Sequence, residues 1–261
     1  MDHIEVIRAE SQRFAQVLAD AAPDAPSPTC PDWTVSDLLW HLVEVHDFWA
    51  GILETGALTD EQMQAVEEAK PQRPETVEET LALRERATAR LCHQLAVHGD
   101  AEPRWTWWPP DQTVGFTRRM QVCEATMHRV DAELAAGVRR TAIGREAAVA
   151  LVDQCVDVMW GWVPEWARQD IHGVVELRAA DTGQRWLMEI GRWSGVGPES
   201  GREFDLPFGR RAQPDAAASA MAVAPVVDLA LWAWKRGGVV QRAGGKDLVA
   251  SLDALVATGI Q

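Results

Sequence analysis

Glu124 and His128 are the first residues whose types and spacing suggest chemistry, because they stand four positions apart in a stretch with helical periodicity. Side chains four apart lie on one face of a helix, about one turn from each other. A carboxylate and an imidazole placed in this way can ligate one cation, as two ligands of an HExxH site do. The same spacing also occurs in solvated Glu–His pairs, so a third candidate ligand is needed to favour a metal site over such a pair.

His41 is available as that third ligand. It stands three residues after Leu38 and four after Asp37, near the edge of the apolar face of an earlier predicted helix. A buried imidazole needs partners for its ring nitrogens. The partner is either a backbone carbonyl or carboxylate, or a metal ion shared with Glu124 and His128. On the second alternative, His41, Glu124 and His128 form a metal centre.

His46 and Asp47 are expected outside this ligand set. His46 follows His41 by five residues, which is about 140° around a helix, so the two imidazoles should not point into one site. We therefore interpret His46 and Asp47 as surface residues or as groups that only support the ligands.

Asp131 has two interpretations. It lies three residues after His128 on the same predicted face. It either orients His128 by accepting its second imidazole N–H, as metal-bound histidines usually require, or it forms a surface pair with Arg129 or Arg119.

Two histidines and one carboxylate leave coordination positions open, which is more typical of catalytic than of structural sites. Zinc is the first expectation, with Fe(II), Mn, Co and Ni behind it, because ligand identity alone does not choose the ion. The Trp-rich stretch at residues 105–110 either caps the end of the predicted bundle, which we favour, or forms an aromatic wall beside the site.

Four amphipathic helices in the first part of the chain must position these residues. Thr34 and Asp37 form a predicted capping box at the start of the second helix, and Gly137 is a suitable stop after the fourth. A helical bundle is therefore predicted for residues 1–140, with a long connection between its second and third helices. The predicted helices cover residues 3–20, 34–53, 76–97 and 117–136.

The pattern changes in the second half of the chain. A helix within 141–168, interrupted by Pro164, is predicted to bridge to a smaller mixed α/β domain at 169–261. The whole is thus an α+β protein. Strands are predicted at 172–179, 184–193 and 215–224, and helices at 225–236 and 246–255.

Composition excludes several classes of protein. The formal net charge of −14 would repel nucleic acid, and no apolar run approaches the roughly 20 residues that span a bilayer. The four cysteines form no CxxC pair, so we expect buried free thiols and no disulfide framework. A cytoplasmic protein without nucleic-acid or membrane partners is expected, and its oligomeric state stays open, with a monomer one option.

Several of these stretches resemble one known family. CPDWTVSDLLWHL at residues 30–42 is similar to the CPxWTVxDLxxHL stretch of the mycothiol-dependent maleylpyruvate isomerase family. TVGFTRRM at 113–120 and EATMHRVDAE at 124–133 resemble its second signature. DLALWAWKR at 228–236 resembles the stretch before its last helix, with Lys235-Arg236 in place of the frequent Gly-Arg ending.

This resemblance implies a DinB-like four-helix bundle followed by an α/β domain, with a metal triad at His41, Glu124 and His128. It also implies mycothiol as a cosubstrate. The thiol would bind the metal as a thiolate and attack a small electrophile such as maleylpyruvate, in an isomerase or an S-transferase reaction. A non-enzymatic sensor or interaction protein that binds a metal or small ligand is the alternative, and dependence of turnover on added thiol separates the two.

Overall fold

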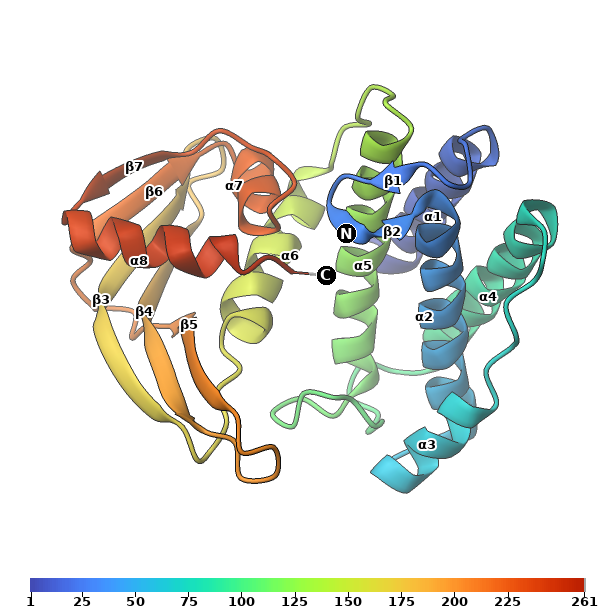
Figure 1. The fold of residues 1–261 in the computed structure, drawn as a ribbon, viewed down its shortest axis with the longest axis horizontal. Helices are drawn as coiled ribbons and strands as arrows, with labels where there is room; N and C mark the ends of the chain where they lie inside the picture. The colour runs from blue at the N-terminus through green and yellow to red at the C-terminus, as the bar shows by residue number, and fades with distance from the viewer. Residues whose placement is uncertain (261) are drawn as a thin grey trace. The chain divides into compact units, whose positions relative to one another are not determined.

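The computed structural model describes residues 1–260, which divide into two compact units. The first unit is Met1–Ala142, and the second begins at Ile143. The protein is α+β, with a helical bundle in the first unit and a mixed sheet with helices in the second (Figure 1). None of the described helices is long and apolar enough to cross a membrane.

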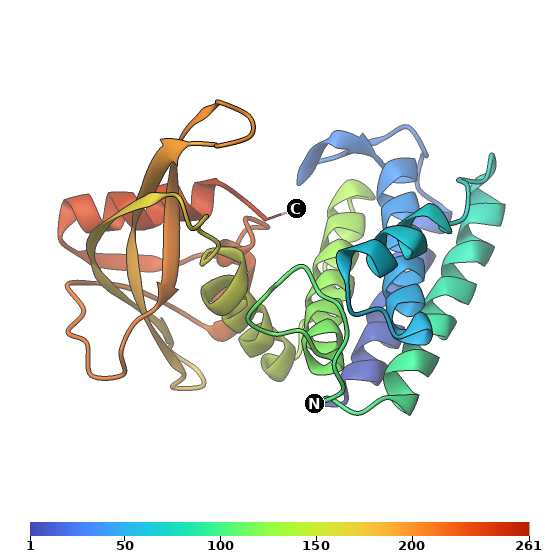
Figure 2. The ribbon, with the colours of Figure 1, turned by 90° about the horizontal axis from the view of Figure 1, so that it is seen from below.

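The first unit is a bundle of four long helices joined by loops, a short helix and a small hairpin (Figure 2). In the packing, α1 lies against α4 and α5, and α2 lies against the same two helices. The face formed by α1 and α4 is therefore opposite the face formed by α2 and α5. The long helices are α1 (His3–Ala19), α2 (Val35–Thr55), α4 (Val77–Val97) and α5 (Val114–Ala135); α3 is Asp60–Glu68.

Local signals set the ends of these helices. The predicted capping box is confirmed, because the Thr34 side chain accepts from the Asp37 amide and the Asp37 carboxylate accepts from the Thr34 amide. Helix α5 begins earlier than predicted, because Thr113 caps it by accepting from the Phe116 amide. Gly137 has a φ of 64° and ends that helix as predicted.

A two-stranded hairpin occupies the segment that was predicted to be a Pro-rich loop. Strand β1 (Pro26–Ser27) pairs antiparallel with β2 (Cys30–Thr34), and β2 leads directly into α2. The hairpin packs on α2 and α5, the two helices that carry the predicted ligands. The bundle core below it is built from Phe14, Leu18, Leu38, Leu39 and Leu42.

The second unit contains a five-stranded sheet in the order β5-β4-β3-β6-β7, in which only β3 and β6 pair in parallel. Helix α8 packs across this sheet, with Leu248 close to Gly173 and Leu255 close to Gly209. The strands are β3 (Arg168–Ala179), β4 (Arg185–Val196), β5 (Glu203–Arg211), β6 (Ala220–Ala224) and β7 (Gln241–Gly244); the helices are α6 (Arg145–Gln154), α7 (Val226–Ala233) and α8 (Lys246–Ala257).

Two predictions for this unit need correction. The helix predicted to run to residue 168 ends at Met159 through a π-helical turn (Cys155–Met159), five residues before Pro164. Strand β5 lies in a polar, Gly- and Pro-containing stretch for which no strand was predicted, and it includes Pro207. It is an edge strand that pairs with β4 only, where a missing N–H is tolerated.

Candidate metal centre

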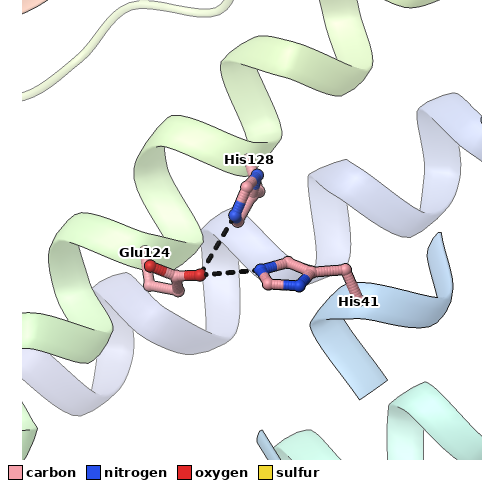
Figure 3. Close-up of side chains that lie close together, drawn as sticks. All are labelled: His41, Glu124 and His128. Atoms are coloured by element: carbon pink, nitrogen blue, oxygen red, sulfur yellow. Dashed lines mark hydrogen bonds and ion pairs between the residues drawn. The ribbon is translucent and has the colours of Figure 1, made fainter. Parts of the chain in front are cut away.

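The structure brings the three predicted ligands together between two helices of the bundle (Figure 3). His41 lies on α2, two turns after the capped start of that helix. Glu124 and His128 lie one turn apart on α5, and their side chains point toward His41. The ligand atoms of all three residues lie within 4.8 Å of one another.

Glu124 is the centre of the group. Its Oε1 is 3.0 Å from Nε2 of His41 and 3.0 Å from Nε2 of His128. Without a cation, each imidazole N–H donates to this carboxylate oxygen. The two imidazole rings stand at a large angle to each other, with their centroids 4.7 Å apart. Nε2 of His41 and Nε2 of His128 therefore approach the same small volume from different directions.

This geometry fits a divalent cation. Two ligand atoms that bind one zinc ion at about 2.0–2.1 Å in a tetrahedral arrangement lie roughly 3.3 Å apart. The observed nitrogen–oxygen separations of 3.0 Å are close to that value. The side chains of His41 and Glu124 keep 26% and 21% of their exposure, so one side of the group is open to solvent. The residues present can hold a cation and leave a position for another ligand.

Asp131 supports His128 from behind. Nδ1 of His128 donates to Oδ2 of Asp131 over 3.0 Å, and the Thr29 hydroxyl donates to Oδ1 over 2.6 Å. The Asp131 side chain is fully buried. The alternative of a surface arginine pair is wrong, because Arg129 pairs with other carboxylates in the bundle and Arg119 pairs with Asp111.

Glu124 and His128 shift each other's pKa values. Burial alone would lower the pKa of His128, but the Glu124 carboxylate and the hydrogen bond to Asp131 raise it to about 9. Burial alone would raise the pKa of Glu124, but the neighbouring His128 and the hydrogen bonds from both histidines hold it well below the usual range. The metal-free group thus holds a proton on His128, which a cation would have to displace.

Trp33 is a residue of the site that sequence reasoning did not single out. Its ring centroid is 4.6 Å from that of His41 and 6.2 Å from that of His128. It reaches the ligands because the hairpin places β2 against α2. Its presence in the CPDWT stretch was the available signal.

The Trp-rich loop does not contact the ligands in any described interaction. Trp105 lies against Phe48 and Trp49 on α2, and Trp107 lies against Phe116 at the start of α5. Its tryptophans therefore cap one end of the bundle, and the aromatic ring beside the site comes from Trp33.

Of the two interpretations of His46, as a surface residue or as a group that supports the ligands, the surface one is wrong. Its side chain is fully buried, and its Nδ1 is 2.9 Å from the Thr88 hydroxyl on α4. Burial lowers the pKa of His46 to about 3, so this imidazole is neutral. It is not among the grouped ligand residues, which agrees with the angular argument.

Comparison with known proteins assigns the segment that carries this site to a family. Residues 4–133 match the family model "Mycothiol maleylpyruvate isomerase N-terminal domain". The chain belongs to the mycothiol-dependent maleylpyruvate isomerase family. This is an enzyme family, and the matched residues include all three predicted ligands and Asp131.

Two solved structures share the fold across both units. One is the mycothiol-dependent maleylpyruvate isomerase, with 14% identity and a TM-score of 0.57. The other is a histidine-to-alanine mutant of that isomerase, with 13% identity and a TM-score of 0.58. Each match covers 93% of this chain and 92% of the other. A search of curated protein sequences finds no significant relative.

Proposed function

We propose that the protein is a metal- and mycothiol-dependent enzyme that acts on a small electrophile such as maleylpyruvate, as an isomerase or an S-transferase. The observation that carries this proposal is the convergence of His41, Glu124 and His128 on one small volume that is open on one side. Zinc fits two imidazoles and a carboxylate well. The position of the triad inside the family-matching segment supports mycothiol as the thiol.

A bound divalent cation stabilises the anionic form of a thiol at neutral pH. The chain's own residues prepare the site for this role. Asp131 holds Nδ1–H of His128, so that Nε2 is the nitrogen directed at the cation. Trp33 forms an aromatic wall beside both imidazoles. The Glu124 carboxylate contributes the negative charge that offsets part of the cation's charge.

The nucleophilic sulfur is supplied by the external thiol. All four cysteines of the chain are buried, and burial raises the pKa of the Cys92 thiol. In the isomerase reaction the thiolate sulfur adds to one carbon of the activated double bond. The resulting single bond rotates, and loss of the same thiolate restores the double bond in its other geometry. In the transferase reaction the carbon–sulfur bond is kept and the adduct takes up a proton.

The test is turnover of maleylpyruvate and of a generic electrophile, with and without mycothiol and with and without a chelator. We expect activity only when thiol and metal are both present, and we expect it to survive Cys→Ser changes at all four cysteines. Glu124→Gln should reduce it by removing the charged ligand. Thiol-independent turnover that persists in chelator would refute the mechanism, and metal binding without turnover of either substrate would favour a binding module.

A further inference from the structure

A cavity of about 340 Å³ lies between α1 and α4, on the side of the bundle opposite the metal centre. It belongs to the first unit alone and shares no residue with the metal ligands. Its lining combines polar, charged and small side chains: Arg8, Gln12, Arg84, Glu85, Thr88, Ala89 and Cys92.

Arg84 is the unusual residue of this cavity. Only 9% of it is exposed, yet the residues that the structure describes give its guanidinium no ion pair. Its Nη1 donates over 3.3 Å to the backbone carbonyl of Ser11, and its Nε has no hydrogen-bond partner among the described residues. A buried charge without a counter-ion is strongly unfavourable. Burial accordingly lowers the pKa of Arg84.

Arg129 shows how the same bundle treats a buried arginine that has a structural role. Its side chain is fully buried on α5, and it pairs with Glu10 and Glu133 at 2.5 and 2.8 Å. It also donates to the carbonyl of Thr141. Arg129 is thus fully neutralised by the chain. Arg84 has the charge of Glu85 in its surroundings but no ion-pair contact among the described residues, and it lines a cavity.

The charges around the cavity decide which anion fits. Arg8 is already paired with Glu5 over 2.8 Å, and Glu85 adds one negative charge to the lining. Counted together with Glu5, the charges of the lining balance, so the cavity has no excess positive charge for a phosphate dianion, and the single guanidinium of Arg84 can pair with one negative charge. The guanidinium fork matches the two oxygens of a carboxylate. Ala89 and the protonated thiol of Cys92 offer a weakly polar wall for a short carbon chain.

We propose that the α1/α4 cavity is a binding site for a small monocarboxylate, held by Arg84. This site is separate from the proposed catalytic centre, and its occupancy does not depend on the thiol reaction. The carboxylate supplies the direct ion-pair contact that Arg84 lacks, and its short apolar tail occupies the space beside Ala89 and Cys92.

The test is an NMR titration of the full-length, metal-loaded protein with sodium butyrate at constant ionic strength. We expect amide shifts to gather at Arg84, Thr88, Ala89 and Cys92. Butyramide has the same shape without the charge and should leave these signals in place. Equal shifts with butyramide, or stronger binding of inorganic phosphate than of butyrate, would overturn the proposal.

Two variants complete the test. Arg84→Met keeps the length of the side chain without the charge and should abolish the butyrate shifts. Glu85→Gln changes an exposed residue, removes the neighbouring negative charge, and should tighten butyrate binding roughly two- to fivefold. Butyrate binding that is retained in Arg84→Met, or that is unchanged or weaker in Glu85→Gln, would refute the assignment. The Glu85 variant keeps the proposal testable if Arg84→Met does not fold.

Discussion

Asp131 accepts a hydrogen bond from the imidazole of His128 over 3.0 Å, and both residues lie on the same turn of α5. This contact commits Nδ1–H of His128, so Nε2 is the nitrogen that faces Glu124. The Thr29 hydroxyl holds the other oxygen of Asp131 from the hairpin. The Nδ1 proton that His128 keeps when Nε2 binds a cation is thus held by neighbouring residues of the chain before any cation binds.

Asp131→Ala should lower the affinity for a divalent cation by about 10- to 100-fold, because His128 loses the group that orients it. Thr29→Val should have a smaller effect in the same direction, because it removes only the outer hydrogen bond. Competition between the protein and a chelator for zinc measures both. An Asp131→Ala protein with wild-type affinity would show that this carboxylate does not support a ligand.

The metal content of the protein should depend on all three ligands. We expect close to one divalent ion per chain, and we expect His41→Ala or His128→Ala to remove most of it, because two remaining ligands bind weakly. His93→Ala is the matched control, since His93 is an exposed residue of α4. Metal analysis of the purified proteins measures the effect. Full occupancy in both ligand variants would disprove the site.

The metal-free protein should lose stability as the pH rises. The pKa of His128 is raised to about 9 in the folded state, above its unfolded value of about 6.5. Its charge therefore stabilises the fold fully below pH 6.5, and this contribution disappears as the pH passes 9. The loss is on the order of 3 kcal/mol in the free energy of unfolding.

Chemical denaturation of chelator-treated protein at pH 6, 7.5 and 9 measures this loss, with His128→Gln as the reference. The difference between the two proteins should shrink as the pH rises. A constant difference across this range would mean that His128 does not carry the proton. Metal-loaded protein should show the opposite sign, because protons compete with the cation for Nε2.

The sequence was sufficient to predict the features that depend on local spacing. Thr34 and Asp37 cap α2 because both partners lie within one turn, and Glu124 and His128 share a face because they are four residues apart. The meeting of His41 with this pair is a tertiary contact, which local spacing does not determine. It was predicted from the apolar periodicity around His41 and from the family resemblance.

Other features depend on neighbours that the local sequence does not specify. His46 was interpreted as a surface or supporting residue because it points about 140° away from His41 on α2. Helix α2 has a neighbour on each side, so the direction away from α5 is occupied by α4, and His46 meets Thr88 there. Trp33 and Thr29 reach the site through a hairpin whose prolines had suggested an irregular loop.

His46 gives the last prediction, which concerns acid stability. Its imidazole is fully buried, and its pKa is lowered to about 3, below its unfolded value of about 6.5. As the pH falls below 6.5, the unfolded chain takes up a proton on His46 and the folded chain does not, so the fold loses stability. Between pH 7.5 and pH 5 this loss should be about 2 kcal/mol in the free energy of unfolding.

His46→Gln can keep a hydrogen bond to Thr88 and does not titrate, so it should remove this acid-sensitive part of the stability while it leaves the metal in place. Urea unfolding at both pH values, with metal analysis of the same samples, measures the two effects. An equal drop in stability in the variant would show that other groups cause the acid sensitivity, and loss of the metal would place His46 among the ligands.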